Sequence, residues 1–271
     1  MNVAANPRPT VSRRDVALAA LGLGFAPVVA AADRTEPCSS VVELRQYTLR
    51  GGQRDGVIAM FQRDLAAPME AAGVRIIGQF RDLDDADRFV WLRGFESMPE
   101  RVRSLAKFYS GDAWRTARAT ASATVLEADN VLLLRPSAPI REFELPTDRR
   151  GGPAGLITAS IRYLTPELVV SYSDFFETSL RPRIEAAGAR VVGAFVTEGG
   201  PNTFPALPIR SADHVHVWFG RFEDQGAQRA SAARVESQSG WRDAAPASLL
   251  PAFMRKTEVL RLAPTAQSRL R

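Results

Sequence analysis

The sequence predicts an α+β fold built from two copies of one β-α-β-β-α-β unit. An internal repeat carries this prediction: residues 65–80 (LAAPMEAAGVRIIGQF) recur 115 positions later as residues 180–195 (LRPRIEAAGARVVGAF), with eight of the sixteen positions identical. Chance pairing gives roughly one identity over that length. In addition, Trp91 recurs as Trp218, 127 positions later. The match indicates a duplicated supersecondary unit, with an insertion of twelve residues, the difference between the two offsets, in the second copy.

Alternating hydrophobicity, helical spacing and Gly or Pro breakers assign the elements of the first copy. Ser97 and Glu100 form a capping box, which favours a helix start between two such segments. The expected elements are a strand at 41–49, a helix from Ile58 that ends at Gly73, strands at 74–81 and 88–95, helices to about Tyr109 and at 112–123, and a last strand around 125–135.

The same signals recur in the second copy, where Thr165 and Pro166 open the first helix. A Gly- and Pro-rich stretch is too irregular for a helix or strand and is assigned as the insertion loop. The expected elements are strands at 156–164 and 189–197, the insertion loop at 199–213, a strand at 214–222, helical segments between 224 and 248, and a strand at 253–262.

These elements divide the chain into five segments with different expected roles. We expect a signal peptide, a first domain, a polar linker, a second domain and a loose C-terminal tail. Their predicted bounds are 1–32, 41–136, 137–153, 154–264 and 265–271.

Each copy is expected to form a ferredoxin-like sheet of four antiparallel strands with both helices on one face. The other face is apolar and must be buried, and a second sheet of the same kind is its natural cover. The prediction is therefore a barrel-like sandwich with a cavity inside. Spacing leaves open whether the barrel closes within one chain or between two chains.

An ordered set of segments carries a family resemblance across residues 41–264: VELRQYTL, EAAGVRIIGQF, FVWLRGFES and KFYSGDAWRTAR in the first copy, and NTFPALPIRSADHVHVWFGRF in the second. Together they resemble the NIPSNAP family, and the chain is similar to its tandem-repeat members. This resemblance implies the dimeric α+β barrel superfamily. Relatives in that superfamily include haem-degrading and quinol monooxygenases, haem-binding enzymes and plain binding proteins, so the resemblance implies a fold rather than an activity.

The N-terminus is typical of an exported protein. Basic residues including Arg13 and Arg14 precede a short apolar run at 16–25 and small residues at 30–32, which is the order of a signal peptide cleaved after Ala32. Ser12-Arg13-Arg14 is similar to a twin-arginine signal. The apolar run is too short for a stable membrane span. We therefore expect a periplasmic or secreted protein.

Charge and motifs exclude several function classes. The formal net charge of +5 falls to +3 when residues 1–32 are removed, and the arginines are scattered among acids, so no nucleic-acid partner is expected. Cys38, the single cysteine, is expected to be an incidental exposed thiol. The sequence contains no phosphate-binding loop, nucleotide fingerprint or serine nucleophile elbow.

Strand alternation gathers a first set of candidate ligand-binding residues on one sheet face. These residues lie on the first and third strands, which are neighbours in a ferredoxin-like sheet. If that face lines the barrel interior, an ion pair, a phenol and an indole surround an apolar cavity. The alternative is that the charges neutralise one another and the indole fills volume. The set comprises Glu43, Arg45, Tyr47, Trp91 and Arg93.

A second set lies on the corresponding strand of the other copy, where His214, His216 and Trp218 share one face. The histidine spacing suits two ligands of one metal, but no third ligand is evident. No cofactor is expected, with a metal ion or haem left as alternatives. His216 and Tyr163 are the candidates for handling protons in a reaction.

Two further features have both structural and functional interpretations. Trp114 and Trp241, each followed by Arg, occupy matching positions and are expected to anchor helical segments. The insertion loop could cover a barrel mouth and contact a ligand, or form a surface loop or a dimer arm. Its candidate contact residues are Asn202, Phe204 and Arg210.

The sequence thus favours an exported protein that binds a small apolar or aromatic molecule in an α+β barrel, or acts as an assembly module, and that forms a homo-oligomer. The alternative is a cofactor-independent or haem-linked monooxygenase. That alternative requires His216, Trp218 and Tyr163 to converge on one enclosed cavity.

Overall fold

The computed structural model describes residues 39–138, 143, 145, 155–238 and 245–271, which belong to one compact unit. Both repeats are present. Helices in the first repeat include the π-helical segment η1. Its elements are β1 (Val41–Leu49), α1 (Arg54–Met60), η1 (Phe61–Leu65), α2 (Ala66–Ala71), β2 (Arg75–Asp82), β3 (Arg88–Phe95), α3 (Met98–Ser110), α4 (Asp112–Thr124), β4 (Val125–Glu127) and β5 (Val131–Pro136).

The second repeat follows the same order, with short 3-10 turns η2 and η4 and a π-helical segment η3. Its elements are β6 (Leu156–Leu164), η2 (Pro166–Leu168), α5 (Val169–Phe175), η3 (Phe176–Leu180), α6 (Arg181–Ala186), β7 (Arg190–Thr197), β8 (His214–Phe222), α7 (Gln225–Ser237), η4 (Ala247–Leu249), α8 (Leu250–Met254) and β9 (Glu258–Pro264).

The long strands of both repeats form one closed antiparallel barrel. Its order is β1-β3-β2-β9-β6-β8-β7-β5, and β5 pairs with β1 to close the ring, while β4 adds to the edge of β1. Two equivalent seams join the repeats: the last strand of each pairs with the second strand of the other, as β5–β7 and β2–β9. The predicted fold class is confirmed, and the barrel closes within a single chain.

The barrel interior is filled with apolar side chains. One buried cluster takes alternate residues from all eight long strands, among them Val42, Leu92 and Val217. Phe143, from the predicted polar linker, joins this cluster and packs its ring 4.7 Å from that of Phe195 and 4.8 Å from that of Phe219, centroid to centroid. The cavity expected inside the barrel is therefore occupied by the core.

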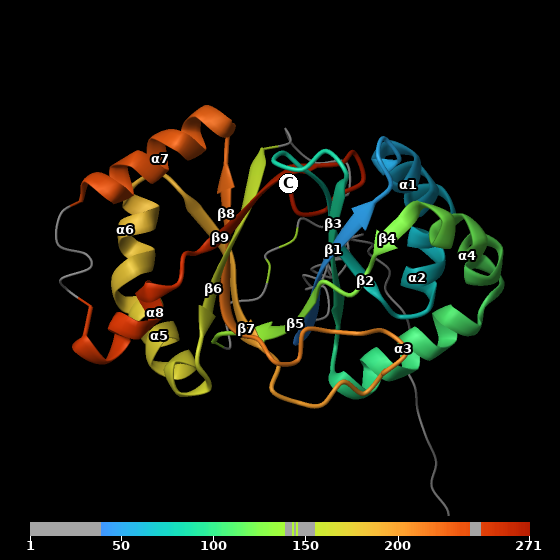
Figure 1. Cartoon of the computed structure of the whole chain (residues 1–271), viewed down its shortest axis with the longest axis horizontal. Helices are drawn as coiled ribbons and strands as arrows, with labels where there is room; N and C mark the ends of the chain where they lie inside the picture. Colours follow the sequence, from blue (N-terminus) through green and yellow to red (C-terminus); the bar gives the residue numbers. More distant parts are fainter. Residues whose placement is uncertain (1–38, 139–142, 144, 146–154, 239–244) are drawn as a thin grey trace, which may run out of the picture. The chain divides into compact units, whose positions relative to one another are not determined.

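The four long strands of each repeat form one half of the barrel, called here the sheet of that repeat. Helices cover the outer faces of these two sheets. In Figure 1, α1 to α4 lie on one side of the strands and α5 to α8 on the other. Each helical layer forms its own buried cluster with the outward side chains of its sheet, one in each repeat. Both faces of each sheet are thus buried, one by the opposing sheet and one by helices.

Local details match between the repeats. The π-helical segments start at Phe61 and Phe176, which are 115 positions apart. Each helix layer then turns into its next strand at a glycine with a positive φ, 99° at Gly73 and 98° at Gly188, which only glycine adopts freely. The capping box is confirmed on the serine side, because the Ser97 hydroxyl accepts a hydrogen bond from the Glu100 amide.

The predicted loose tail is wrong. Ser268 is fully buried and Leu270 is 3% exposed, and the Leu270 amide donates to the Ile77 carbonyl. The tail continues past β9 along β2, where unpaired backbone groups would otherwise face the core. In the described part of the chain, no helix is long and apolar enough to cross a membrane. The signal peptide, Cys38 and Trp241 lie outside the described residues.

Candidate functional site

A buried ionic cluster underlies the helices of the first repeat. Glu43 on β1 is contacted by three arginines, through Arg45 Nη1 at 2.6 Å, Arg93 Nε at 2.7 Å and Arg101 Nε at 2.7 Å. All four side chains are at most 1% exposed. Arg45 Nε also donates to the Tyr47 hydroxyl at 3.1 Å. These charge-assisted bonds tie the first and third strands to α3.

The arginines decide the charge of Glu43. Burial alone raises the pKa of the Glu43 carboxyl, but Arg93, Arg45 and Arg101 together outweigh it and hold that pKa well below its ordinary range. Burial raises the pKa of the Tyr109 phenol, which adjoins Arg93. The cluster is therefore a carboxylate with three guanidinium groups and a neutral phenol.

A cavity of about 380 Å³, the first-repeat pocket, opens beside this cluster. Arg45, Trp91 and Tyr109 line it together with apolar side chains from the helices, including Met60 and Phe61. The guanidinium carbon of Arg45 lies 5.6 Å from the Trp91 ring centroid, a cation–π contact. This pocket lies between the sheet and the helices.

The insertion loop of the second repeat covers the first-repeat pocket. Phe204 stacks on Tyr109 at 6.0 Å between centroids, Asn202 accepts a hydrogen bond from Arg101 Nη1 at 3.2 Å, and residues 206–208 line the cavity. Arg210 bonds the side chains of Asn130 and Tyr163. The loop therefore covers a pocket under the helices of the other repeat, while its Arg210 also contacts Tyr163 of the barrel core.

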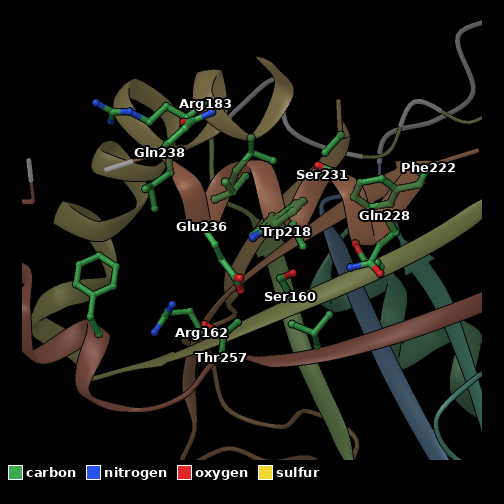
Figure 2. Close-up of a pocket in the computed structure, with 18 of the residues that line it drawn as sticks. Ser160, Arg162, Arg183, Trp218, Phe222, Gln228, Ser231, Glu236, Gln238 and Thr257 are labelled. Atoms are coloured by element: carbon green, nitrogen blue, oxygen red, sulfur yellow. The ribbon is translucent and has the colours of Figure 1, made fainter. Parts of the chain in front are cut away.

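The equivalent cavity of the second repeat, the second-repeat pocket, has a volume of about 300 Å³. Figure 2 shows it with Trp218 at its centre and with Glu236 pointing from α7 toward Ser160 and Arg162 on the sheet. Apolar side chains complete the wall, namely Leu180, Ile184, Phe222, Val235 and Phe253. A few polar groups in a largely apolar cavity are typical of small-molecule sites.

Strand register explains why the second pocket differs from the first. Glu43 pairs with Arg93 and Arg45 with Trp91 on β1 and β3, while the corresponding pairs on β6 and β8 are Thr158 with Gly220 and Ser160 with Trp218. Every charged sheet residue of the ionic cluster is thus replaced by a small one. Their reduced volume leaves room beside Trp218, which is partly exposed where Trp91 is buried.

His216 is fully buried and contacts rings instead of ligands. Its ring lies 4.5 Å from that of Phe176 and 5.3 Å from that of Tyr172, between centroids. Neither of its nitrogens has a hydrogen-bond partner. Burial, with a contribution from Arg162, lowers the pKa of His216 to about 3. The imidazole is therefore neutral and packs as a core ring.

Tyr163 lies on the other face of the sheet. It belongs to the barrel core, donates from its hydroxyl to Glu258 Oε2 at 2.6 Å and accepts from Arg210 Nη2 at 2.9 Å. His216 and Trp218 face the helices instead. Because alternate residues of a strand point to opposite faces, the three residues do not converge on one cavity.

The histidine pair does not fit a metal or a haem. His214 begins β8 and is partly exposed, whereas His216 has no exposed surface and lines neither helix-covered pocket. Among the described residues, no group of three or more His, Cys, Asp or Glu side chains is placed to hold a metal ion. The rings of Phe176 and Tyr172 pack against the His216 ring, which has no exposed surface, so both of its nitrogens are enclosed.

The structure brings the first set of candidates together, but on the sheet face that the helices cover and not on the face that lines the barrel interior. Glu43, Arg45, Tyr47, Trp91 and Arg93 point under the helices, and the barrel interior receives their neighbours Val42, Leu44, Val90 and Leu92. The interior assignment is therefore wrong. The alternative of mutual neutralisation holds in part, since Glu43 neutralises one arginine of three.

Sequence reasoning missed two residues of the first-repeat cluster, Arg101 and Tyr109. Arg101 shares the buried face of α3 with Ser104, Leu105 and Phe108, so a charged residue at the 3.6-residue spacing of an apolar stripe was the available signal. Trp114 packs its ring 4.9 Å from that of Tyr109, as its expected anchoring role requires, and it also lines the pocket.

Comparisons with known proteins place this geometry in a broad fold group. No family model matches the chain, and no curated protein matches it. Solved structures do. A proposed monooxygenase from Lactobacillus acidophilus aligns at a TM-score of 0.51 with 10% identity, over 83% of this chain and 93% of that one. A second proposed monooxygenase, from Fusobacterium nucleatum, aligns at 0.52 with 8% identity, over 83% and 91%.

Solved NIPSNAP structures are also among those the chain is similar to. An uncharacterised NIPSNAP-like domain protein from Burkholderia xenovorans is 26% identical over 40% of this chain and 97% of that one, at a TM-score of 0.34. At their low identities, the two proposed monooxygenases show the fold alone, that of an α+β barrel with helices outside.

Proposed function

We propose that this protein is an exported binding protein that holds a small apolar or aromatic molecule in the second-repeat pocket. The observation that carries the proposal is the cavity of about 300 Å³ beside Trp218, at a position where the first repeat has buried charged side chains. A cavity of this size and lining suits a ligand of one or two rings.

The polar groups of the pocket would orient such a ligand. Arg162 Nη1 is held by the carbonyls of Ala252 and Arg255 at 3.1 and 2.9 Å, which fixes its guanidinium at one end, while its Nε is buried without an acceptor. Ser160 and Glu236 add hydrogen-bonding groups nearby. One polar atom on an otherwise apolar ligand would satisfy the Arg162 donor.

The monooxygenase alternative has no specific observation in its favour. The two residues expected to handle protons, His216 and Tyr163, line neither the first-repeat nor the second-repeat pocket. The assembly-module alternative and the homo-oligomer are separate predictions. A partner chain is not needed to close the barrel, so an oligomer would form through outer surfaces.

The test of the proposal is saturable binding of N-phenyl-1-naphthylamine, a neutral probe that fluoresces in apolar sites, to the chain from Asp33 onward. Ser160→Phe fills the pocket floor and should weaken binding at least tenfold. Ala206→Trp, which fills the first-repeat pocket from an exposed loop position, is the matched control and should leave it unchanged. Equal probe binding by Ser160→Phe and the unaltered chain would remove the proposed site.

Native mass spectrometry of the chain purified from its exported compartment tests the rest. A retained small molecule lost in Ser160→Phe would support the proposal, and the same spectrum reads the oligomeric state. Replacing Arg13 and Arg14 by Lys should leave an unprocessed precursor inside the cell if the twin-arginine route carries it.

A further inference from the structure

The first-repeat cluster has a charge imbalance that its own residues do not resolve. In the described part of the chain, Glu43 is the carboxylate that pairs with Arg45, Arg93 and Arg101, so two buried positive charges lack a counter-charge. Asp129 lines the nearby pocket but is exposed to solvent. Buried charges are ordinarily paired, because an unpaired ion loses its hydration without compensation.

Unmatched donors occur at the same place. Arg101 Nη2 and Trp91 Nε1 are buried without a hydrogen-bond acceptor, and both side chains are at most 1% exposed. Beyond Glu43, Arg93 has the neutral Tyr109 hydroxyl beside it. Of these, Trp91 lines the first-repeat pocket beside Arg45 and Tyr47. The cluster therefore lacks both negative charge and acceptor atoms, which points to a missing anion.

The lining of the first-repeat pocket indicates what kind of molecule would carry this anion. Its inner end is formed by the buried side chains of Arg45 and Trp91, and its mouth by the exposed residues Ser122, Leu126 and Asp129. Between them the lining is mostly apolar, with Met60, Phe61, Leu65 and Met69 from the helices. A ligand that fills about 380 Å³ must bring an apolar body behind a small charged head.

We propose that the first-repeat pocket is a second binding site, specific for an apolar or aromatic carboxylate. The carboxylate would lie at the inner end against Arg45, the Tyr47 hydroxyl and the Trp91 Nε1 donor, with the apolar body between the sheet and the helices. Arg45 already donates from Nε to Tyr47, from Nη1 to Glu43 and from Nη2 to the Ala128 carbonyl at 3.3 Å. The carboxylate would therefore accept from the second hydrogens of the two Nη atoms and from Trp91 Nε1, and it would supply one of the two missing negative charges. This site is independent of the one in the second repeat.

The insertion loop gives the site a cover. Ala206, Leu207 and Pro208 line the cavity, and Phe204 stacks on Tyr109. Because Asn202 bonds Arg101 at the same time, the loop is tied to the ionic cluster. The second repeat thereby contributes the cover of the first repeat's pocket and none of its charge.

The experiment compares 2-naphthoate with 2-naphthamide, which has the same body and no charge, by titration calorimetry on the chain from Asp33 onward at pH 7. We expect the naphthoate to bind at least tenfold more tightly, and its affinity to fall as salt is raised. Equal affinities for the two probes would overturn the proposal. So would the absence of measurable naphthoate binding at millimolar concentration.

Variants assign the binding to this pocket. Arg45→Met removes the inner charge and should abolish the preference for naphthoate. Because this change also removes a partner of Glu43, its binding data count only if the circular dichroism spectrum shows that the variant is folded. Ala206→Trp alters an exposed loop position and fills the pocket without touching the cluster. Ala206→Trp should weaken the binding of 2-naphthoate at least tenfold. Ser160→Phe, in the second-repeat pocket, should change the affinity for 2-naphthoate less than twofold. The reverse pattern would place the carboxylate in the second repeat and overturn the proposal.

Discussion

The two repeats use the same backbone to bury opposite kinds of side chains. Under its helices the first repeat holds Glu43 with three arginines, and at the matching sheet positions the second holds Thr158, Ser160 and Gly220. Helix α3 contributes Arg101 and Tyr109, where α7 contributes Gln228 and Glu236, each 127 positions later. A duplicated fold can therefore keep its architecture while one copy places an ionic cluster beside its helix-covered pocket and the other places small side chains beside the equivalent pocket.

Removing the central carboxylate should have the largest effect on this contrast. Glu43→Gln leaves three buried guanidinium groups without a counter-charge, and we expect a loss of about 3–5 kcal/mol in the free energy of unfolding. The matched change in the second repeat, Thr158→Val, should cost about 1 kcal/mol or less. Urea denaturation of both variants makes the comparison. Similar losses would mean that the ionic core does not distinguish the repeats.

Acidification sharpens the same comparison. The folded-state pKa of Glu43 is lowered, so its stabilisation is present above the ordinary carboxyl pKa and is lost as the pH falls through the lowered value. The difference in unfolding free energy between the unaltered chain and Glu43→Gln should therefore shrink below about pH 4. A difference that stays constant down to pH 2 would contradict the assigned charge state.

His216 tests the second repeat, because the register places Phe89 at the equivalent position of the first. His216→Phe removes two buried nitrogens without partners and should stabilise the fold by roughly 1–2 kcal/mol at neutral pH. The His216 pKa is lowered to about 3. Below about pH 6.5 the His216 imidazole takes up a proton in the unfolded chain but not in the folded chain. The free energy of unfolding of the unaltered chain should therefore fall as the pH drops from 6.5 toward 3.

The measurement is the free energy of unfolding of His216→Phe and of the unaltered chain at several pH values from 7 to 4. The unaltered chain should lose up to about 1.4 kcal/mol more per pH unit than His216→Phe. Parallel pH profiles would show that the imidazole can be protonated in the folded protein, and would restore it as a candidate for proton transfer.

The insertion loop offers a smaller effect. Phe204→Ala removes the ring that stacks on Tyr109 and should cost about 1 kcal/mol, while hydrogen exchange becomes faster in the loop and in the first-repeat helices. The second-repeat helices should keep their protection, because the loop packs against the first repeat's cluster. Uniformly faster exchange in both repeats would argue against a cover specific to the first.

The smallest expected difference is between two glycine variants of similar cost, and it tests the equivalence of the repeats. Gly73→Ala and Gly188→Ala both force a side chain into a positive φ, at a cost of about 1–2 kcal/mol each. An added Cβ would meet the Ser104 hydroxyl at 2.7 Å in one repeat and the end of the longer Arg234 side chain at 2.8 Å in the other. Thermal unfolding should therefore show a slightly larger loss for Gly73→Ala, and a strongly unequal pair would mean that the turns are not equivalent.

Sequence patterns predicted the faces of the strands but not their surroundings. Alternation placed Glu43 and Arg45 on one face, and neighbouring strands placed that face beside Trp91 and Arg93, as the pairing confirms. It also placed His216 with Trp218. The partners from elsewhere in the chain, Arg101 and the insertion loop, could not be predicted this way because helix packing and loop docking depend on the assembled fold.

By itself, the sequence determined the duplication, the order of elements and the α+β barrel, because repeat identity, periodicity and turn residues are local signals. Only the tertiary structure decided which sheet face is the barrel interior, that one chain closes the barrel and that the insertion loop covers the first repeat. The physical reason is that both faces of each sheet are buried, one by the opposing sheet and one by helices. Alternation encodes which residues share a face and carries no information about what that face meets.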